Sequence, residues 1–204
     1  MPPWRRNSVR DDYSVFPAQI KVAPDGRVAL YAGDRQRIRD RGHEIGFHPG
    51  YNTYSRKHEW QQQLAILQDA LPDYAALHGG RQHFLRFAVP TTWRLWAESG
   101  LDYDSTLGFA DHAGFRCGTC YPFPVFDLET RKELPIVERP LIAMECSVMA
   151  GQYMGLGTSE KALQTFIDLR ERCRKFSGEF VFLWHNSSLV TEEEREMYMQ
   201  VVTG

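Results

Sequence analysis

The sequence predicts an α/β fold in which helices surround a parallel sheet or barrel. Apolar runs of strand length alternate with helix-like periodic segments along most of the chain, as is typical of parallel sheets. The run at 179–184, EFVFLW, is almost continuously apolar, as expected for a strand that is covered on both faces. With 204 residues the chain is long enough for one substantial core, so we expect a single domain over 1–204.

The N-terminal elements are the least clearly patterned, and residues 1–33 form a weakly patterned segment. Segments 20–22 and 27–31 are predicted to form a hairpin, because the Asp-Gly pair between them is a strong turn signal. A short basic helix is expected at 34–41, where a glycine ends it. Alternating apolar residues then predict a strand at 44–47.

The clearest helix is predicted at 56–71, where large apolar residues recur at four-three-four spacing before a proline. Ser159 is expected to cap a later helix, and Thr191 with Glu194 forms a capping box for the last one. The elements expected after the helix at 56–71 are, in order, a helix at 91–99, a strand at 101–104, a long loop at 104–128, a strand at 141–144, a helix at 159–175, a strand at 179–184 and a C-terminal helix.

Composition excludes several classes of protein. The 24 basic and 26 acidic residues give a formal charge of −2, so no field of one sign points to nucleic acid or an anionic membrane. The basic N-terminus lacks the apolar run of a signal peptide, and no segment approaches a membrane span. Four cysteines do not suggest a disulfide scaffold, and a reducing, cytoplasmic setting is the simplest expectation.

Polar side chains follow three of the predicted strands. His48 with Asn52 comes after the first, the segment 81–83 (Arg-Gln-His) after the second, and His185 with Asn186 after the last. Because ligands and reactions in α/β folds concentrate at the carboxyl ends of the strands, we expect these groups to share a site.

The pair His48 and Asn52 allows two interpretations. An imidazole nitrogen with an amide oxygen can bind a divalent metal, although Asn is a poorer ligand than His or a carboxylate. Alternatively, Asn52 hydrogen-bonds the Pro49-Gly50 turn and His48 has no role.

The Cys117-Gly-Thr-Cys120 segment also allows several interpretations. A structural zinc site would need a second pair of ligands, and a thioredoxin-like pair should open a helix, which the prolines at 122 and 124 disfavour. The remaining interpretation is that two small buried thiols pack a loop.

The long loop and the aromatic residues offer groups for a ligand. Asp104 is either a functional carboxylate or the acceptor of local turn hydrogen bonds, and Arg116 could bind an anionic group or orient a carboxylate. Flat aromatic surfaces of the kind that sugars prefer are supplied by Tyr51, Tyr54, Trp93, Phe109, Phe115, Tyr121 and Trp184, although most of them are expected in the core.

The motifs GHEIGFH, an arginine-containing segment before Pro90, YDSTLGF and LWH occur in this order over residues 35–200. This order resembles the polysaccharide deacetylase family (carbohydrate esterase family four), in particular a subgroup with HPxYNTY and GFRCGTCxPFP motifs. The resemblance implies a deformed (β/α) barrel over 34–204 that lacks its first strand or strands. It also implies a metal-dependent hydrolase that removes acetyl groups from a sugar or polysaccharide precursor.

The resemblance also assigns residues. His48 matches the first metal histidine and Asn52 stands where the second normally is, so both are expected to hold a divalent metal, zinc in the first instance. His185 matches the general acid, and Arg81, with Arg86 as the alternative, the arginine that orients the base. The expected substrate-binding residues are His83, Tyr54, Asp104, Arg116 and Trp184.

The chain departs from the family at its first motif, a strand that ends in paired aspartates. Asp11-Asp12 follows WRRNSVR and no apolar strand. Two alternatives to an active deacetylase therefore stay open: a catalytically impaired carbohydrate-binding relative of the same fold, and a redox protein that uses Cys117 and Cys120.

Overall fold

The computed structural model describes residues 20–21, 43–71 and 77–204. The predicted segments 27–31 and 34–41 lie outside these residues, as does Asp11-Asp12. The described chain forms a mixed α/β fold with a mostly parallel sheet in the order β1-β2-β3-β4-β6-β5, and a second, two-stranded parallel sheet β7-β8. The strands are β1 (Ile20–Lys21), β2 (Phe47–His48), β3 (Gly79–Gly80), β4 (Tyr103–Asp104), β5 (Phe123–Asp127), β6 (Lys132–Glu138), β7 (Ala143–Met144) and β8 (Phe182–Leu183).

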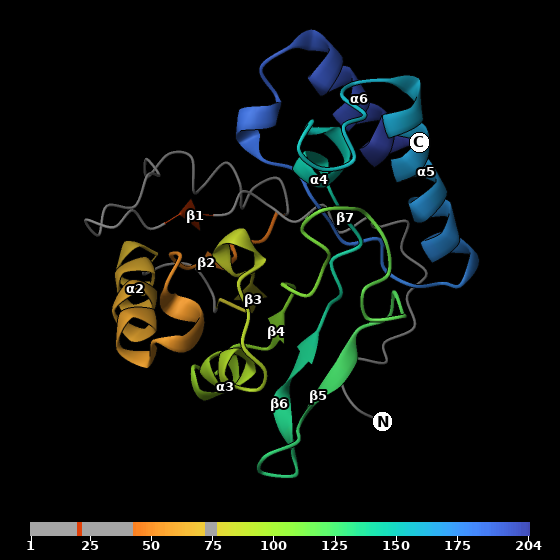
Figure 1. The fold of residues 1–204 in the computed structure, drawn as a ribbon. Helices are drawn as coiled ribbons and strands as arrows, with labels where there is room; N and C mark the ends of the chain where they lie inside the picture. Colours follow the sequence, from red (N-terminus) through yellow and green to blue (C-terminus); the bar gives the residue numbers. More distant parts are fainter. Residues whose placement is uncertain (1–19, 22–42, 72–76) are drawn as a thin grey trace.

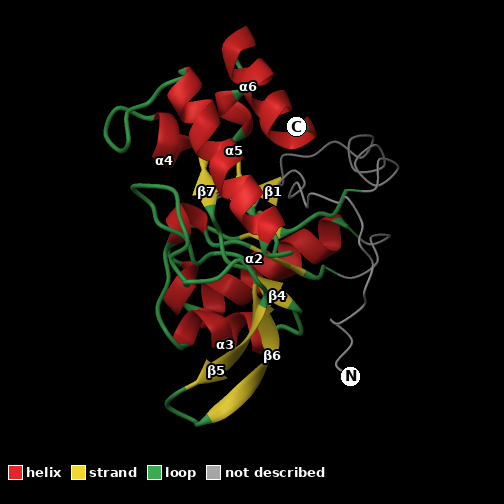
Figure 2. Ribbon diagram, turned by 90° about the vertical axis from the view of Figure 1, so that its right-hand side faces the viewer, coloured by secondary structure: helices red, strands yellow, loops and turns green. Residues whose placement is uncertain are grey.

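Five α-helices are described, and three short 3₁₀ turns follow strands or loops. The α-helices are α2 (Lys57–Ala70), α3 (Thr91–Glu98), α4 (Glu145–Met149), α5 (Glu160–Lys175) and α6 (Glu192–Thr203), and the 3₁₀ turns are η1 (Thr53–Ser55), η2 (His83–Leu85) and η3 (Asn186–Ser188). Helices α4, α5 and α6 gather at one end of the molecule, and the β5–β6 hairpin projects at the other (Figure 1). The view from the side shows the same separation (Figure 2).

Most predicted elements are confirmed to within a few residues. The long helix α2, the helix α3 and the final helix are present, and the Ser159 cap and the Thr191 capping box both form. The prediction of one loop over 104–128 was wrong, because β5 occupies 123–127 and pairs antiparallel with β6. The prolines at 122, 124 and 135 hid this hairpin, and β5 lies at the edge of the sheet, where prolines are tolerated.

Strand β1 was expected in a hairpin with 27–31. In the described residues it pairs in parallel with β2, so that Ile20 lies beside Phe47 and Lys21 beside His48. The sheet therefore has a strand before β2, at the edge where the family resemblance predicted that one or more were missing.

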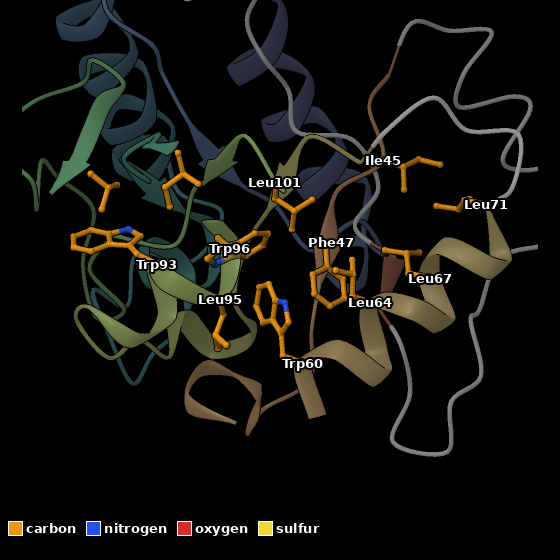
Figure 3. Close-up of a cluster of buried hydrophobic side chains, with 12 residues drawn as sticks. Ile45, Phe47, Trp60, Leu64, Leu67, Leu71, Trp93, Leu95, Trp96 and Leu101 are labelled. Atoms are coloured by element: carbon orange, nitrogen blue, oxygen red, sulfur yellow. The ribbon is translucent and has the colours of Figure 1, made fainter. Parts of the chain in front are cut away.

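The larger core lies between the sheet and helices α2 and α3. Phe47, Trp60 and Trp96 are almost completely buried, and their rings meet edge to face with centroids 4.7–6.0 Å apart (Figure 3). The indole N–H of Trp60 donates to Ser99 Oγ at 2.8 Å, so its burial leaves no polar atom unsatisfied. This core fixes β2, the strand that ends in His48.

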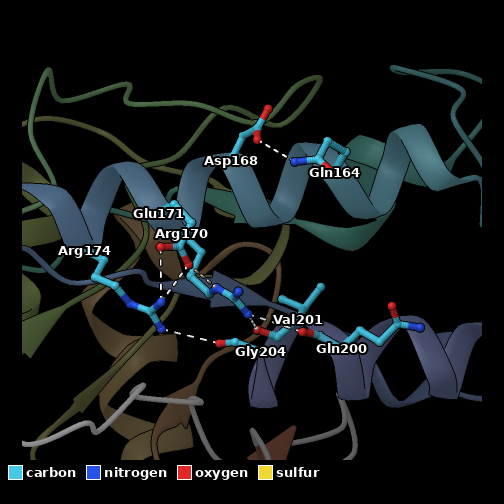
Figure 4. A network of polar contacts seen from close by, with 8 residues as sticks. All are labelled: Gln164, Asp168, Arg170, Glu171, Arg174, Gln200, Val201 and Gly204. Atoms are coloured by element: carbon cyan, nitrogen blue, oxygen red, sulfur yellow. Dashed lines mark hydrogen bonds and ion pairs between the residues drawn. The ribbon is translucent and has the colours of Figure 1, made fainter.

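A second core joins β8 to α5 and α6, and includes Phe166, Phe182 and Met197. A buried arginine strengthens the contact between α5 and α6. Arg170 of α5 donates from Nη1 to the carbonyl of Val201, 2.9 Å away near the end of α6 (Figure 4). Carbonyls of a last helical turn lack intrahelical partners, so a cation there satisfies them.

The parallel strands bring their carboxyl ends to one edge of each sheet. Asp104 lies beside both Gly80 and Glu138 in the register of β3, β4 and β6. Glycine is required at position 80, because a Cβ there would collide with the backbone of Phe47 in β2. The close approach of β2 and β3 that results decides which side chains meet just beyond these strands.

Candidate active site

His48 ends β2 and is buried, with 8% of its surface exposed. Its Nδ1 lies 2.7 Å from the carbonyl oxygen of Arg81, so this nitrogen carries the proton and donates it. The lone pair is therefore on Nε2. A backbone carbonyl that fixes the tautomer in this way is the usual companion of a metal-binding histidine.

The surroundings of His48 keep its ring neutral. Burial lowers its pKa to about 3 against the opposing effect of the hydrogen bond to the Arg81 carbonyl. A histidine must be neutral to bind a metal, and His48 meets this condition at physiological pH.

The side chain of His83 lies beside the lone pair of His48. Its Nδ1 lies 3.2 Å from His48 Nε2, and the two rings meet edge to face with centroids 5.1 Å apart. The backbone N–H of Arg81 donates to the carbonyl of Phe47 at 3.0 Å, which holds the end of β3 against β2. His83, predicted as a substrate-binding residue, is thus brought together with His48.

Asn52 has different neighbours. It is exposed before η1, and its Oδ1 is 3.5 Å from Nη1 of Arg86. The guanidinium of Arg86 lies over the rings of Tyr51 and Tyr54, at 4.0 and 4.2 Å from their centroids, and donates to the Tyr54 hydroxyl at 2.9 Å. Tyr54 and Asn52 therefore belong to a group of side chains organised by Arg86.

His185 follows β8 and is oriented by a carboxylate. Its Nδ1 is 2.6 Å from Oε1 of Glu145, which is 1% exposed and also accepts from the hydroxyl of Ser188 at 3.0 Å. The side chain of His185 itself is 43% exposed. Glu145 is the first residue of α4, directly after β7, so the neighbouring strands β7 and β8 place the two side chains.

Glu145 was not among the predicted site residues. It follows the predicted strand at 141–144 directly, so the logic that singled out His48 and His185 as polar groups after a strand would also have found it.

A group of three charged side chains is completely buried at the carboxyl ends of β3, β4 and β6, and consists of Arg81, Asp104 and Glu138. Arg81 donates from Nε to the carbonyl of Ser105 at 2.8 Å, and burial lowers its pKa to about 10. Glu138 accepts from the indole of Trp93 and from the backbone, each at 2.9 Å, and its pKa lies well above its usual range because of burial. Burial raises the pKa of the adjacent Asp104 to about 7, so the pair of acids is not fully ionised at neutral pH.

The complete burial of these side chains bears on the roles predicted for Arg81 and Asp104. Arg81 and Asp104 were expected to act on the base and the substrate, and both side chains have no exposed surface. They therefore support the strand ends from inside. Glu138 was missed because the chain around it was assigned no strand.

Two aromatic rings lie on the surface beside His83. Phe84 is 71% exposed and Tyr51 is 52% exposed, with ring centroids 5.5 Å apart, and Phe84 meets the His83 ring at 4.5 Å. Phe84 has a φ of 56° and Leu85 a φ of 52°, and this left-handed conformation is unfavourable for residues with a side chain. Strained backbone of this kind clusters at functional sites. We call Tyr51 and Phe84 the aromatic surface.

Arg116 and Trp184, both predicted to bind substrate, make contacts in other parts of the molecule. Arg116 is exposed and donates to the carbonyl of Gly108 within the long loop, at 2.8 Å. Trp184 is half-buried and packs on Phe166 and Tyr198, with its indole N–H bound to the carbonyl of Ser188. The observed role of Trp184 is packing of the C-terminal core.

The cysteines do not have the properties of a redox pair. Burial raises the pKa of Cys117 to about 11, and Cys120 is buried beside Cys173, whose pKa is raised to about 12. A reactive thiol needs a lowered pKa. These environments argue against the redox alternative and favour thiols that pack a loop.

The residues that could hold a metal are His48 and His83. Within 20–21, 43–71 and 77–204, no group of three or more His, Cys, Asp or Glu side chains converges in a way that could hold an ion. Catalytic zinc sites have three protein ligands and a water, so the described residues account for two positions. Two imidazole nitrogens at this separation fit such an ion in chemistry.

A comparison with models of known protein families gave no match, and a search of curated proteins found none similar to this chain. The family resemblance therefore rests on the quoted motifs. Among the described helices, none combines the length and apolar character needed to cross a membrane.

Proposed function

We propose that the protein is a metal-dependent hydrolase of the polysaccharide deacetylase type, built on a deformed (β/α) barrel. Its reaction would remove acetyl groups from nitrogen, or from oxygen, on a sugar or polysaccharide precursor. The observation that carries the proposal is the pairing at the strand ends. There, the neutral His48 is fixed by a backbone carbonyl at the end of β2, and His185, after β8, is fixed by a buried carboxylate.

A bound divalent cation would polarise the acetyl carbonyl and lower the pKa of a water molecule. His48 would supply a neutral nitrogen to such an ion without first losing a proton, because burial already holds it neutral. The rigid end of β2 and the hydrogen bond to Arg81 keep that nitrogen in place.

His185 would act as the general acid. Its Nδ1–H is donated to Glu145, which leaves Nε2 to hold the proton that the departing amine or alkoxide takes up. The carboxyl group of Glu145 fixes the orientation of the His185 ring, and the hydroxyl of Ser188 donates to the same carboxyl oxygen. The exposed face of His185 gives a substrate access to Nε2.

No residue is assigned here as the base. Asp104 and Glu138 are completely buried, and a base must reach the water that it deprotonates. We assign to these acids and to Arg81 the role of positioning β3, β4 and β6.

The aromatic surface supports a sugar as the substrate. Exposed rings of Tyr51 and Phe84, adjacent to His83, offer flat apolar faces on which the C–H side of a sugar ring can pack. Arg86, stacked on Tyr51, adds hydrogen-bond donors for hydroxyl or carbonyl oxygens.

Acetate release from N-acetylated chitooligosaccharides and from O-acetylated xylan, with and without added zinc or cobalt, tests the proposal. His185→Gln should reduce turnover by about 10²- to 10⁴-fold, the usual contribution of a general acid. His112→Gln, which changes an exposed histidine paired with Asp111, is the matched control and should leave turnover unchanged. Metal-dependent acetate release that is equally fast in the two variants would contradict the role of His185.

A second candidate is a carbohydrate-binding relative without catalysis. It is favoured by the two-ligand count at the metal site within the described residues. Saturable binding of the same saccharides, with no acetate released under any metal condition, would support it.

A further inference from the structure

We propose that His83, and not Asn52, supplies the second protein ligand beside His48 for a divalent cation of the zinc type. The inference rests on the proposed function and gives its metal site a ligand set. It depends on how two neighbouring strands end, since His48 and His83 are 35 residues apart in the sequence.

The first argument is the distance between the two nitrogens. With zinc–nitrogen bonds of 2.0–2.1 Å and a tetrahedral angle, two ligand nitrogens are separated by about 3.3–3.4 Å. Nε2 of His48 and Nδ1 of His83 are 3.2 Å apart. An ion could therefore take both nitrogens at nearly this separation, once the two rings turn so that both lone pairs point to it.

The second argument is the state of the two rings. His48 donates from Nδ1 to the Arg81 carbonyl, so the nitrogen that faces His83 is unprotonated. Without a cation, His83 donates its Nδ1–H to that nitrogen. With a cation, His83 can carry its proton on Nε2 instead and turn the Nδ1 lone pair to the ion. The change moves one proton between the two ring nitrogens of His83 and leaves the hydrogen bond from His48 to the Arg81 carbonyl in place.

The third argument concerns Asn52. Its Oδ1 faces the guanidinium of Arg86, at 3.5 Å from Nη1, so an ion bound to that oxygen would be brought close to a fixed positive charge. Zinc also prefers imidazole to an amide oxygen. The side chain of Asn52 is exposed, whereas His48 is buried and His83 half-buried, and a drier site strengthens the attraction between an ion and its ligands.

The test measures binding of zinc and of cobalt to the metal-free full chain by titration calorimetry, together with the visible spectrum of the cobalt form. His83→Gln should weaken binding by at least about 10- to 100-fold, because even a lost outer-shell partner costs that much. Asn52→Ala should change it by less than about threefold. His78→Gln is the matched control, because His78 precedes β3 and its exposed ring is paired with Asp102. It should bind as the unmodified chain does.

A second measurement identifies the bound nitrogens in the unmodified chain and uses His83→Gln only to assign them. In the chain labelled with ¹⁵N-histidine and loaded with ¹¹³Cd²⁺, scalar coupling between cadmium and nitrogen identifies each bound imidazole atom. We expect coupling at Nε2 of one histidine and at Nδ1 of a second, assigned to His48 and His83 by comparison with His83→Gln. Coupling to one histidine alone, or metal affinity lost in Asn52→Ala and kept in His83→Gln, would overturn the inference.

Acetate release on the unmodified chain separates this inference from the proposed function. Metal held by His48 and His83 without acetate release would support the site and contradict the deacetylase. Metal-dependent acetate release that survives in His83→Gln with unchanged affinity would support the deacetylase and overturn the ligand assignment. A chain that binds no zinc, cobalt or cadmium would overturn both.

Discussion

The backbone at Phe84 gives a prediction in which the sign of a stability difference is decisive. Phe84 combines a left-handed backbone, with φ of 56° and ψ of 22°, and a side chain that is 71% exposed. Such a conformation costs a residue with a Cβ about 1–2 kcal/mol, and little burial of the ring offsets it. We predict that Phe84→Gly is more stable than Phe84→Ala.

The magnitude follows from comparing the two variants with each other. Both remove the ring and its contacts with Tyr51 and His83, so those losses cancel. Glycine relieves the backbone strain of about 1–2 kcal/mol, and its greater freedom in the unfolded chain takes back about 0.4–1 kcal/mol. At the midpoints of these ranges the glycine variant should be more stable by about 0.8 kcal/mol, which corresponds to a Tm about 2–3 °C higher for a chain of this length.

Thermal and urea unfolding of the two variants measure this difference directly. At an unstrained position in a helix or strand the order reverses, and alanine is the more stable by about 0.5–1 kcal/mol. An alanine variant that equals or exceeds the glycine variant would refute the strain at Phe84. In the same samples, affinity for the bound saccharide should fall by about 2- to 12-fold in both variants, since both lose the aromatic face.

Three further predictions concern carboxyl groups. Glu145→Gln keeps the shape of the partner of His185 but weakens the hydrogen bond that orients its ring, so turnover in the acetate-release assay should fall by roughly 10²-fold. Burial raises the pKa of Asp104 to about 7, above its unfolded value of about 3.9, so its contribution to stability is full below pH 4 and is lost as pH rises through 7. Urea unfolding should therefore show a smaller loss of stability between pH 4 and pH 8 in Asp104→Asn than in the unmodified chain; an equal loss would contradict this. The guanidinium of Arg94 holds the pKa of Asp127 well below its usual range, so Asp127→Asn should lower the Tm at pH 7, and the difference should shrink as pH falls below about 4.

The sequence predicted elements well where local signals agreed with the tertiary structure. The four-three-four spacing in α2 and the side-chain cap at Ser159 are local features, and both are present as expected. The β5–β6 hairpin was missed because proline argues against a strand in general and not against an edge strand. Strand β6 forms through its pairing with β5 and β4, and pairing is not visible in a single segment.

The predicted site residues also differ in how far the local sequence determines where their side chains lie. A polar residue directly after an apolar run locates His48 and His185 at strand ends, and the structure places both there. The sequence does not reveal that Asp104 faces inward, or that the contacts of Trp184 are with the C-terminal core. Whether a side chain after β4 or β8 points to solvent or to a neighbouring helix depends on the packing of elements far apart in the chain.

The same reasoning explains why a spacing motif is a weaker guide to a metal site than strand adjacency. Four residues after His48 the chain has entered η1, where Asn52 is exposed and faces Arg86. His83 opens η2 shortly after the neighbouring strand β3, and the bond from the N–H of Arg81 to the carbonyl of Phe47 fixes the end of β3 relative to β2. Two ligands that closely follow adjacent parallel strands start from a backbone whose separation the sheet fixes, and a stable separation favours ion binding. If the ion is bound beside these strand ends, its protein ligands are His48 at the end of β2 and His83 in the turn after β3, and Asn52 is not one of them.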